Sequence, residues 1–525
     1  MTHSPFRLAA VGAALTVFSP CPAWTAPAGP APSPAGSVVA AWTQVVRGAT
    51  GNTPAQPATE LRFVIQKDVS SPDDIAVCAN FAVAFTRQDG SSGVAAAPVP
   101  RPNPDAAAFP VALCTVAMMP DWTGAAVTAA GSTAPLDIWF ENGSTGLQAV
   151  VPGPWLIGRQ HRDDTGNPEL RLASVGDTGC KGKVGGDPSS RDYQDCSGWR
   201  FAEIVASIAG QGRPGATTPD LVIHVGDYRY FWEPIAADPS PSPDTWSYWL
   251  RDFFQPARPA LLKTPWAFSR GNHELCSPWY GSGWAYLLGP GSGTDCRSLD
   301  KAALWSFDAA PGGIDASGKS ANSHRFVMID TSADRDMATL KQNFIGAIAL
   351  SDVPSVWWVT HIPGISLLHF GGRTHRGDSG IQSALQAALS GMAHGFCDST
   401  RQPSCRPSTF LMGHQHLFQR IEFFENADPA RPYVWPQQVI GGHGGVRQDN
   451  AGLRASPCGY DFGAHRSVGV DHTAIVWSDT RHGYVDWVRS AATIDENSGW
   501  RASPMLADGS RMTLAPASAN PPSCR

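Results

Sequence analysis

Side chains that can bind metal ions gather in five short segments of the sequence. The segments are Gly176-Asp177-Thr178-Gly179, Gly226-Asp227-Tyr228-Arg229-Tyr230, Gly271-Asn272-His273-Glu274, Thr360-His361-Ile362-Pro363 and Gly413-His414-Gln415-His416. Together they offer carboxylate, phenol, amide and imidazole ligands, and most include glycine, which allows the backbone to turn tightly around a common centre. Taken singly each is a weak signal, since an Asp after a strand can cap a helix and a lone His is usually a satisfied polar residue.

The order of the five segments is more informative than any one of them. It resembles the purple acid phosphatase branch of the calcineurin-like metallophosphoesterases, whose blocks read DxG, GDxxY, GNH(E/D), a strand ending in His, and GHxH. The resemblance spans residues 177–416 and implies a four-layer αββα sandwich. It also implies a first metal held by Asp177, Asp227, Tyr230 and His416, and a second held by Asp227, Asn272, His361 and His414. Asp227 would then be shared by the two ions.

Gly179 and Tyr230 indicate the branch within that superfamily. Most calcineurin-like enzymes have a His two residues after the first Asp, whereas this chain has Gly179 there and a Tyr three residues after Asp227. The first site collects two carboxylates and a phenolate, so it favours the harder and more highly charged ion. We therefore expect Fe(III) in the Tyr230 site and Fe(II), Zn or Mn in the second site. Such a pair would hydrolyse phosphomonoesters by attack of a metal-bound hydroxide.

Several other polar residues are candidates for roles near the metals. His273 matches the family's GNH histidine, so we expect it to protonate the leaving group or steady the phosphoryl charge; bracing the ligands is the alternative. Glu274 is expected to support the ligands rather than to bind metal. His443, in the Gly-rich run 441–445, is a candidate substrate contact or simply part of a turn. Arg373 and His375 are either phosphate contacts or residues of an exposed loop.

Apolar runs that end where the polar segments begin predict the elements that position these residues. Strands are expected at 170–175, 221–225, 325–329, 356–360, 409–412 and 437–440, with helices at 199–209 and 381–392. This alternation is typical of α/β architecture, in which ligands bind at the carboxyl ends of the strands. Residues 61–157 instead alternate short β-rich runs with turns. We expect a small all-β sandwich domain over 24–160, a catalytic domain over 161–490 and a tail over 491–525.

The first residues and the cysteines indicate an exported protein. Arg7, the apolar run 8–18 and Ala23 have the layout of a signal peptide over residues 1–23, with a lipid anchor on Cys21 as the alternative. Ten cysteines remain after its removal, an even number that suits an oxidising compartment. Pairing neighbours along the chain would give 78–114, 180–196, 276–296, 397–405 and 458–524, although sequence cannot establish the connectivity. The predicted location is secreted or periplasmic, and no other run is long and apolar enough to span a membrane.

Composition and motif context exclude several other functions. The net charge of −6 over 525 residues offers no broad basic surface, so we expect a small phosphorylated substrate and no nucleic acid as a structural partner. Residues 313–320 fit P-loop spacing and residues 210–215 fit a dinucleotide fingerprint, but neither lies between a strand and a helix. A phosphodiesterase or nucleotidase on the same metal pair stays open as an alternative, as does a surface-binding protein with a vestigial catalytic domain.

Overall fold

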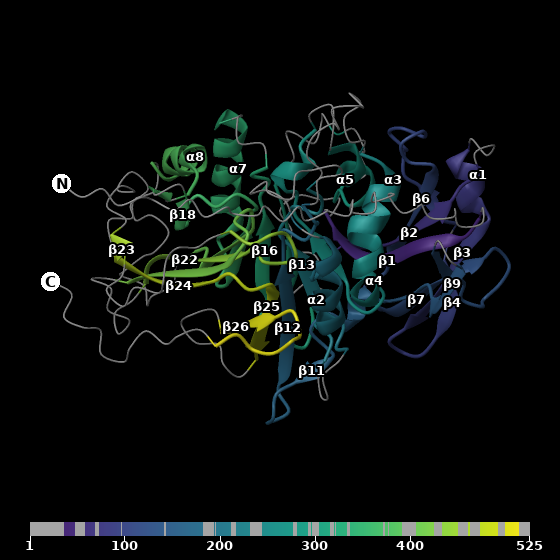
Figure 1. Cartoon of the computed structure of the whole chain (residues 1–525). Helices are drawn as coiled ribbons and strands as arrows, with labels where there is room; N and C mark the ends of the chain where they lie inside the picture. Colours follow the sequence, from purple (N-terminus) through teal and green to yellow (C-terminus); the bar gives the residue numbers. More distant parts are fainter. Residues whose placement is uncertain are drawn as a thin grey trace, which may run out of the picture.

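The fold is seen in a computed structural model of the 525-residue chain (Figure 1). It describes residues 36–47, 58–68, 73–95, 97–140, 143–181, 194, 196–211, 217–230, 244–276, 281–291, 296, 304–314, 320, 322–332, 337–370, 373–375, 377–390, 406–424, 433–449, 460–461, 473–491 and 499–513. The predicted signal peptide and the cysteines at 397, 405, 458 and 524 lie outside these ranges. Within the described ranges, no helix combines the length and apolar character needed to cross a bilayer.

One large sheet runs through most of the chain in the order β26-β25-β12-β13-β14-β1-β2-β6-β5, with β8, β9 and β11 attached to it. Its strands are β1 Val38–Val46, β2 Ala58–Gln66, β5 Val99–Pro100, β6 Val111–Met118, β8 Asp137–Phe140, β9 Gly143–Gln148, β11 His161–Arg162, β12 Pro168–Val175, β13 Leu221–His224, β14 Trp266–Phe268, β25 Gly483–Ser490 and β26 Trp500–Leu506. Strands β12, β13 and β14 are parallel neighbours, with Leu172 opposite Leu221 and Val222 opposite Trp266. Their carboxyl ends therefore meet at one edge.

A second sheet has eight strands in the order β15-β16-β17-β20-β22-β21-β24-β23. These are β15 Trp305–Ala309, β16 His324–Met328, β17 Val356–Val359, β20 Thr409–Met412, β21 Phe418–Phe424, β22 Tyr433–Gly441, β23 Tyr460–Asp461 and β24 Thr473–Asp479. Strands β16, β17, β20 and β22 pair in that order and are parallel to one another. The predicted strands are thus present in both sheets, with ends shifted by a few residues.

The two sheets pack face to face and helices cover their outer faces. Residues such as Leu172, Ile223 and Trp357 form one core between the sheets. Side chains alternate along a strand, so Trp358 points outward into a core with α7 Met337–Leu350 and α8 Ser379–Leu389. The outer face of the large sheet is covered by α2 Phe201–Ile208 and by the run α3 Trp246–Trp249, π-helix η3 Leu250–Phe254 and α4 Gln255–Leu261 (Figure 1). This is the predicted four-layer αββα sandwich.

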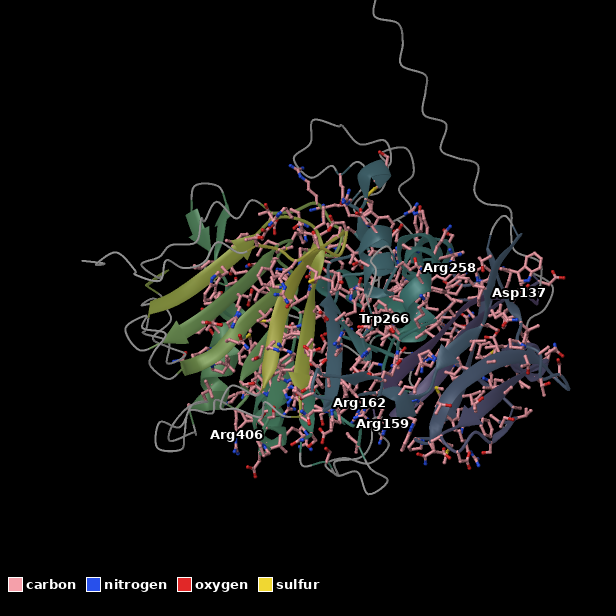
Figure 2. The ribbon with its side chains drawn as sticks, turned by 90° about the horizontal axis from the view of Figure 1, so that it is seen from below. Asp137, Arg159, Arg162, Arg258, Trp266 and Arg406 are labelled. Atoms are coloured by element: carbon pink, nitrogen blue, oxygen red, sulfur yellow. A yellow bond between two sulfur atoms is a disulfide. The ribbon has the colours of Figure 1, made fainter. Side chains whose placement is uncertain are left out.

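The N-terminal all-β region is continuous with the large sheet. Strand β1 pairs in parallel with β14 through Gln44 and Trp266, and Trp266 lies buried in the interior at this junction (Figure 2). A separate sheet, in the order β10-β7-β3-β4, packs on the extension. It contains β3 Phe81–Arg87, β4 Ser92–Val94, β7 Trp122–Ala129 and β10 Val150–Pro152. The all-β character is as expected, the continuity is a finding of the structure, and the domain boundary at 160 stays a prediction.

Helices were predicted less completely than strands. The predicted helices at 199–209 and 381–392 correspond to α2 and α8, whereas α7 and the α3–η3–α4 run were not predicted. The shorter elements are α1 Asp74–Ala79, α5 Gly281–Leu287, η1 Pro154–Leu156, η2 Cys196–Gly198, η4 Asn272–Glu274, β18 Leu368–Phe370 and β19 Arg373–His375. Disulfides join Cys78 to Cys114, Cys180 to Cys196 and Cys276 to Cys296, which confirms three of the neighbour pairings.

Candidate metal centre

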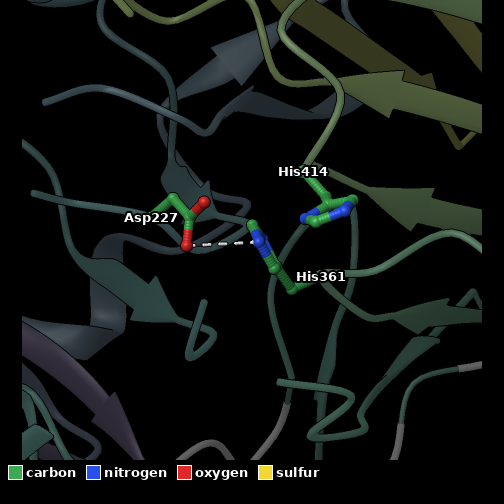
Figure 3. Close-up of side chains that lie close together, drawn as sticks. All are labelled: Asp227, His361 and His414. Carbon is green, nitrogen blue, oxygen red and sulfur yellow. Dashed lines mark ion pairs between the residues drawn. The ribbon is translucent and has the colours of Figure 1, made fainter. Parts of the chain in front are cut away.

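All five polar segments follow the carboxyl ends of parallel strands. Asp177 follows β12, Asp227 follows β13 and Asn272 follows β14, all in the large sheet, while His361 follows β17 and His414 follows β20 in the second sheet. Figure 3 shows Asp227 facing His361 and His414 across the space between the two sets of loops. Each sheet therefore supplies part of the cluster, and the face-to-face packing of the sheets brings the parts together.

The backbone is held in an unusual conformation at three of these residues. Asp177, Asp227 and His414 have φ values of 56°, 59° and 71°, and within the described ranges they are the only residues other than glycine with positive φ. This conformation costs free energy for a residue with a side chain, and such residues cluster at functional sites. Backbone hydrogen bonds fix it, since Asp177 N donates to Gly226 O at 2.9 Å and Thr178 N donates to Asp227 O at 2.9 Å.

The first half of the cluster contains two carboxylates, a phenol and an imidazole. The Tyr230 hydroxyl lies 2.7 Å from Asp177 Oδ1 and 3.1 Å from Asp227 Oδ2. His416 Nε2 lies 3.7 Å from Asp177 Oδ1. Tyr230 is 1% exposed and both carboxylates are equally buried, so water cannot solvate their charges. These four are the residues predicted for the first metal.

The second half contains an amide oxygen between two imidazoles. Asn272 Oδ1 lies 2.9 Å from His361 Nε2 and 2.7 Å from His414 Nδ1. Asp227 Oδ1 lies 3.2 Å from His361 Nε2, so Asp227 contacts both halves of the cluster. His361 Nδ1 lies 2.7 Å from the Val225 carbonyl. A proton on Nδ1 donated to that carbonyl would leave the Nε2 lone pair directed into the cluster, as in metal-bound histidines.

The arrangement of the ligand atoms suits bound cations better than it suits direct contacts among the ligands themselves. One ligand atom from each of Asp227, His361 and His414 lies within 4.8 Å of the others. Burial, and then the charge of Asp227, raise the pKa of Asp177 well above its usual range. Burial lowers the pKa of His361, but the charge and hydrogen bond of Asp227, the charge of Asp177 and the contact with the Val225 carbonyl together outweigh it and raise that pKa to about 9. Two buried carboxylates that face each other are an environment that a bound cation relieves.

Two polar residues stand directly beside these ligands. His273 N donates to Asp227 Oδ1 at 3.0 Å, its Nε2 lies 3.8 Å from Asp227 Oδ2, and its side chain is 16% exposed. Burial lowers the pKa of His273 to about 4. Glu274 accepts hydrogen bonds from the backbone N–H groups of Tyr228 at 2.9 Å, Gly271 at 3.1 Å and Asp227 at 3.2 Å. Glu274 therefore holds the ligand-bearing loops.

Two neighbours of the cluster were not singled out from the sequence. Asp449 Oδ2 accepts the His416 N–H at 3.0 Å and its Oδ1 lies 3.7 Å from His416 Nδ1. His224 stacks on Tyr228 at 3.9 Å and its Nε2 lies 3.0 Å from Thr178 Oγ1. Asp449 lies outside the five motif blocks, so its sequence position carries no signal. His224 lies within the predicted strand 221–225, three residues before Asp227, so its position in the sequence is a signal that it stands near the site.

The other candidate residues are placed less directly. His443 is fully buried, and its ring lies 5.7 Å from that of Phe418. The glycines on either side pack against the Asp177 loop, because a Cβ on Gly442 would lie 2.7 Å from Asp177 Oδ2 and one on Gly444 would lie 2.3 Å from Gly176 O. The substrate contact of His443 stays a prediction. The side chains of Arg373 and His375 lie outside the described part of the structure.

Comparisons with known proteins agree with this geometry. Residues 170–418 match the family model for calcineurin-like phosphoesterases, a range that contains all five ligand segments. The structure is similar to that of the purple acid phosphatase PPD1 from seeds of yellow lupin (Lupinus luteus), with a TM-score of 0.51 and 13% sequence identity, covering 91% of this chain and 74% of the lupin chain. No curated protein matches the sequence. At this identity the lupin structure is evidence of a shared fold.

Proposed function

We propose that this chain, in which residues 170–418 match the calcineurin-like phosphoesterase family model and whose fold is similar to that of a purple acid phosphatase, is a binuclear metal-dependent phosphomonoesterase of the acid phosphatase type. One observation carries the proposal. Asp227 contacts Tyr230 on one side and His361 on the other, so a single carboxylate faces both halves of the cluster. A shared carboxylate of this kind can hold two cations side by side.

The ligands divide into two sets of different charge. We assign Asp177, Asp227, Tyr230 and His416 to the first ion, and Asp227, Asn272, His361 and His414 to the second, since contacts of 3.8 Å or less link neighbours within each set. When bound, the two cations would neutralise a phosphate, activate water and stabilise the entering and leaving oxygens. The set with two carboxylates and Tyr230 favours Fe(III), and the set with neutral amide and imidazole donors favours Fe(II), Zn or Mn.

The surrounding side chains would act on the substrate directly. His273 is the partly exposed polar residue beside Asp227, which places it where the substrate would enter. In hydrolysis, the oxygen of water forms a bond to phosphorus while the bond to the leaving oxygen breaks, and that oxygen takes up a proton. His273 Nε2 is suited to deliver this proton or to hold the phosphoryl charge. Glu274 would hold the backbone of Asp227 and Gly271 in place during the reaction.

Export to an oxidising compartment belongs to the same proposal. The three disulfides Cys78–Cys114, Cys180–Cys196 and Cys276–Cys296 support it, since disulfides persist in secreted and periplasmic proteins. Two of them lie beside ligand segments, because Cys180 follows Asp177 by three residues and Cys276 follows Asn272 by four. They would fasten the loops that carry the ligands.

The test combines metal analysis, a visible spectrum and two assays on the purified protein. We expect two metal ions per chain, a visible charge-transfer band from Tyr230 phenolate on Fe(III), and higher kcat/KM for p-nitrophenyl phosphate than for bis(p-nitrophenyl) phosphate. A fully metallated protein without a visible band would contradict the Fe(III) assignment. A preference for the diester would select the phosphodiesterase reading, and absence of bound metal would favour a surface-binding protein.

A further inference from the structure

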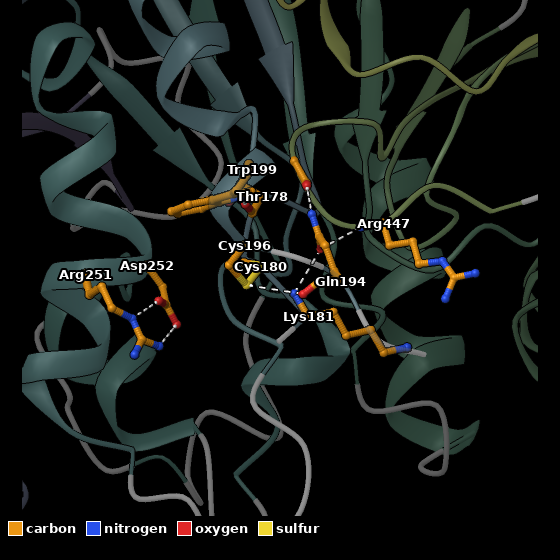
Figure 4. The surroundings of a disulfide bond; sticks show 10 residues. Thr178, Cys180, Lys181, Gln194, Cys196, Trp199, Arg251, Asp252 and Arg447 are labelled. Carbon is orange, nitrogen blue, oxygen red and sulfur yellow. Dashed lines mark hydrogen bonds and ion pairs between the residues drawn. A yellow bond between two sulfur atoms is a disulfide. The ribbon is translucent and has the colours of Figure 1, made fainter. Parts of the chain in front are cut away.

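The loops that carry the ligands of the metal centre are fastened in different ways. The loop after β12 is closed by the Cys180–Cys196 disulfide, and Trp199 Nε1 donates to Thr178 O at 2.8 Å in the same loop (Figure 4). The loop after β14 has a disulfide of its own, as described above. No cysteine occurs between positions 196 and 276. The loop after β13, which carries Tyr230, must therefore be held by other contacts.

A buried ion pair holds the Tyr230 loop. Arg229 immediately precedes Tyr230, and its side chain is 4% exposed. Its Nη1 donates to Asp244 Oδ1 in a close ion pair, and its guanidinium lies 5.5 Å from the ring centre of Trp249. Within the described ranges, Nε and Nη2 of Arg229 have no hydrogen-bond partner. Because a buried charge without a partner is costly, the Arg229 cation depends on Asp244.

The backbone of Arg229 also touches the Asp177 loop. A Cβ on Gly179 would lie 2.6 Å from Tyr228 O and 2.8 Å from Arg229 Cα, so glycine at position 179 lets the two loops meet backbone to backbone. Gly179 is two residues from Asp177, whose Oδ1 lies 2.7 Å from the Tyr230 hydroxyl. The position of Arg229 therefore sets how Tyr230 meets Asp177.

Helix α5 fixes Asp244 in turn. Asp244 Oδ2 accepts the Gly283 N–H of α5 at 2.6 Å, and its Oδ1 accepts the Trp249 Nε1–H at 2.8 Å. The start of α5 also packs on the segment that follows η4, because a Cβ on Gly281 would lie 2.7 Å from Leu275 O. Helix α5 thus contacts the segments behind two of the ligand-bearing loops.

Two buried arginines of the N-terminal all-β region hold the other end of α5. Arg62 on β2 is 0% exposed and donates to Leu287 O and to Gly289 O, both at 2.9 Å. Arg101, the residue after β5, donates to Tyr286 O at 2.9 Å. Carbonyls at the carboxyl end of a helix have no partner within the helix, and positive charge is favourable there. The N-terminal region therefore anchors the helix that holds Asp244.

We propose that Arg229 and Asp244 are positioning residues of the first metal site, which hold Tyr230 in reach of the ion. Through α5, Arg62 and Arg101 hold this pair in place. The inference rests on the proposed two-metal function and adds a role for the N-terminal all-β region in that function.

The effect of the ion pair should be confined to the Tyr230 site. The shared ligand Asp227 is held separately, since its N–H donates to Glu274 Oε2 at 3.2 Å and its Oδ1 accepts the His273 N–H at 3.0 Å. Groups that orient metal ligands typically change metal affinity by about 10–100-fold when they are replaced. Loss of the ion pair should therefore weaken the first site and leave the second nearly intact.

The experiment measures the affinity for each ion separately. The full-length wild type, Asp244→Asn, Arg229→Met and Arg229→Lys are loaded with Fe(III) and Zn(II) and dialysed against increasing nitrilotriacetate, and the iron and zinc retained per chain are measured. We expect Asp244→Asn and Arg229→Met to weaken iron binding about tenfold or more and zinc binding less than about threefold. Absorbance of the visible band per bound iron should fall with them.

Two further variants test the pairing itself. Arg229→Lys keeps the positive charge beside Asp244 and should retain most of the iron affinity. A variant that combines Arg229→Met with Asp244→Asn should bind iron no more weakly than either single variant, because each single change already removes the same ion pair.

A second buried ion pair provides the matched control. Asp308 Oδ1 accepts the Arg325 Nε–H at 2.8 Å, and the two side chains are 7% and 13% exposed. This pair joins β15 to the amino end of β16, away from the carboxyl ends that carry the ligands. Asp308→Asn should lower the Tm of the metal-free protein, as Asp244→Asn does, but leave both ion affinities unchanged.

The contribution of the N-terminal region is tested with Arg62→Met and Arg101→Lys. Each should weaken iron binding about threefold, the size expected of a residue that acts through others, and should add nothing further in the Asp244→Asn background. Arg101→Lys keeps the charge, so it tests the same link if Arg62→Met does not fold. Unchanged iron affinity in the variants that fold would remove the N-terminal region from the proposal.

Two results would overturn the positioning role. Unchanged iron affinity in both Asp244→Asn and Arg229→Met would show that the pair does not hold Tyr230. An equal loss in Asp308→Asn would show that any lost ion pair weakens iron binding through stability alone. Failure of the proposed function has a different signature, since the wild type would then bind both ions but hydrolyse no p-nitrophenyl phosphate, while the ion affinities of the variants stay measurable.

Discussion

The two ends of β12 and β13 both carry a buried carboxylate, but the two carboxylates have different surroundings. Asp177 follows the carboxyl end of β12, and Asp220 immediately precedes β13 at the opposite edge. Both are fully buried, and burial raises the pKa of each, that of Asp220 to about 7. Burial alone therefore does not distinguish a metal ligand from a structural acid.

The neighbours of the two carboxylates make the distinction. Asp220 Oδ2 accepts the Arg171 N–H at 2.8 Å and lies 4.0 Å from His161 Nε2, and the nearby backbone of Gly158 and Gln160 opposes part of the rise in its pKa. Asp177 instead faces Asp227, whose charge raises its pKa further. Asp220 therefore faces donors within the fold, whereas two facing carboxylates leave a demand for positive charge. A cation site is therefore recognised by acceptor atoms that face other acceptor atoms.

The largest effect is expected from Asp227→Asn. Because Asp227 contacts both ligand sets, removing its charge should release metal and lower kcat/KM by at least about 10³-fold, a loss of several kcal/mol of transition-state stabilisation. Phosphatase assays and metal analysis measure this. Asp220→Asn is the matched control at the other edge and should keep its metals. If Asp227→Asn kept two ions and its activity, facing carboxylates would not be what distinguishes the metal site from the surroundings of Asp220.

Replacing His273 separates chemistry from metal binding. His273→Asn should lower kcat about 10²-fold, the usual contribution of a positioned proton donor, while metal content stays nearly unchanged. The physical reason is that its side chain stands beside Asp227 at 3.8 Å rather than among the converging ligand atoms. If the variant loses its metals instead, His273 is a brace of the ligands and the proton must come from another group.

Removal of the metals should destabilise the protein. The loss should come from the sheet edge that carries Asp177 and not from the edge that carries Asp220. Ligands that bind only the folded state contribute roughly 3 kcal/mol when their concentration is about a hundred times Kd. Chelation should therefore lower the Tm of the wild type. Asp177→Asn should be less affected by the chelator, because it binds metal weakly from the start and lacks one of the two facing charges. Equal Tm shifts in both proteins would contradict this.

The smallest effect is expected at Asp220 and concerns pH. Its folded-state pKa of about 7 exceeds the usual aspartate value, so the protonated form favours the folded state. The resulting stability is complete below about pH 4 and is lost as pH rises through about 7, by a few kcal/mol at most. Urea unfolding should show that Asp220→Asn loses less stability than the wild type between pH 4.5 and 7.5. Parallel pH profiles for the two proteins would refute the assignment.

The sequence predicted the site better than it predicted the long-range connections. The strands that end at Asp177, Asp227 and His414 have distinct apolar runs, so both the strands and the meeting of their loops were foreseeable. The pairing of β1 with β14 was not, because Gln44 and Trp266 are far apart in sequence and no local pattern encodes a parallel pairing.

Helix α7 and residue Asp449 were missed for different physical reasons. Within α7, Leu340, Phe344 and Ala347 are buried at helical spacing, but apolar residues such as Ile345 also lie on its exposed face and weaken the periodicity. Asp449 reaches His416 only because the loop after β22 folds back over the site. Its role depends on tertiary contacts, which a single sequence does not display.

The most direct test of the central claim is a crystal structure of the purified native protein with anomalous scattering data collected at the iron edge and above the zinc edge. We expect two metal ions about 3.5–4 Å apart, with Asp227 bound to both and Tyr230 bound to iron. A single ion, or two ions without Asp227 between them, would contradict the account.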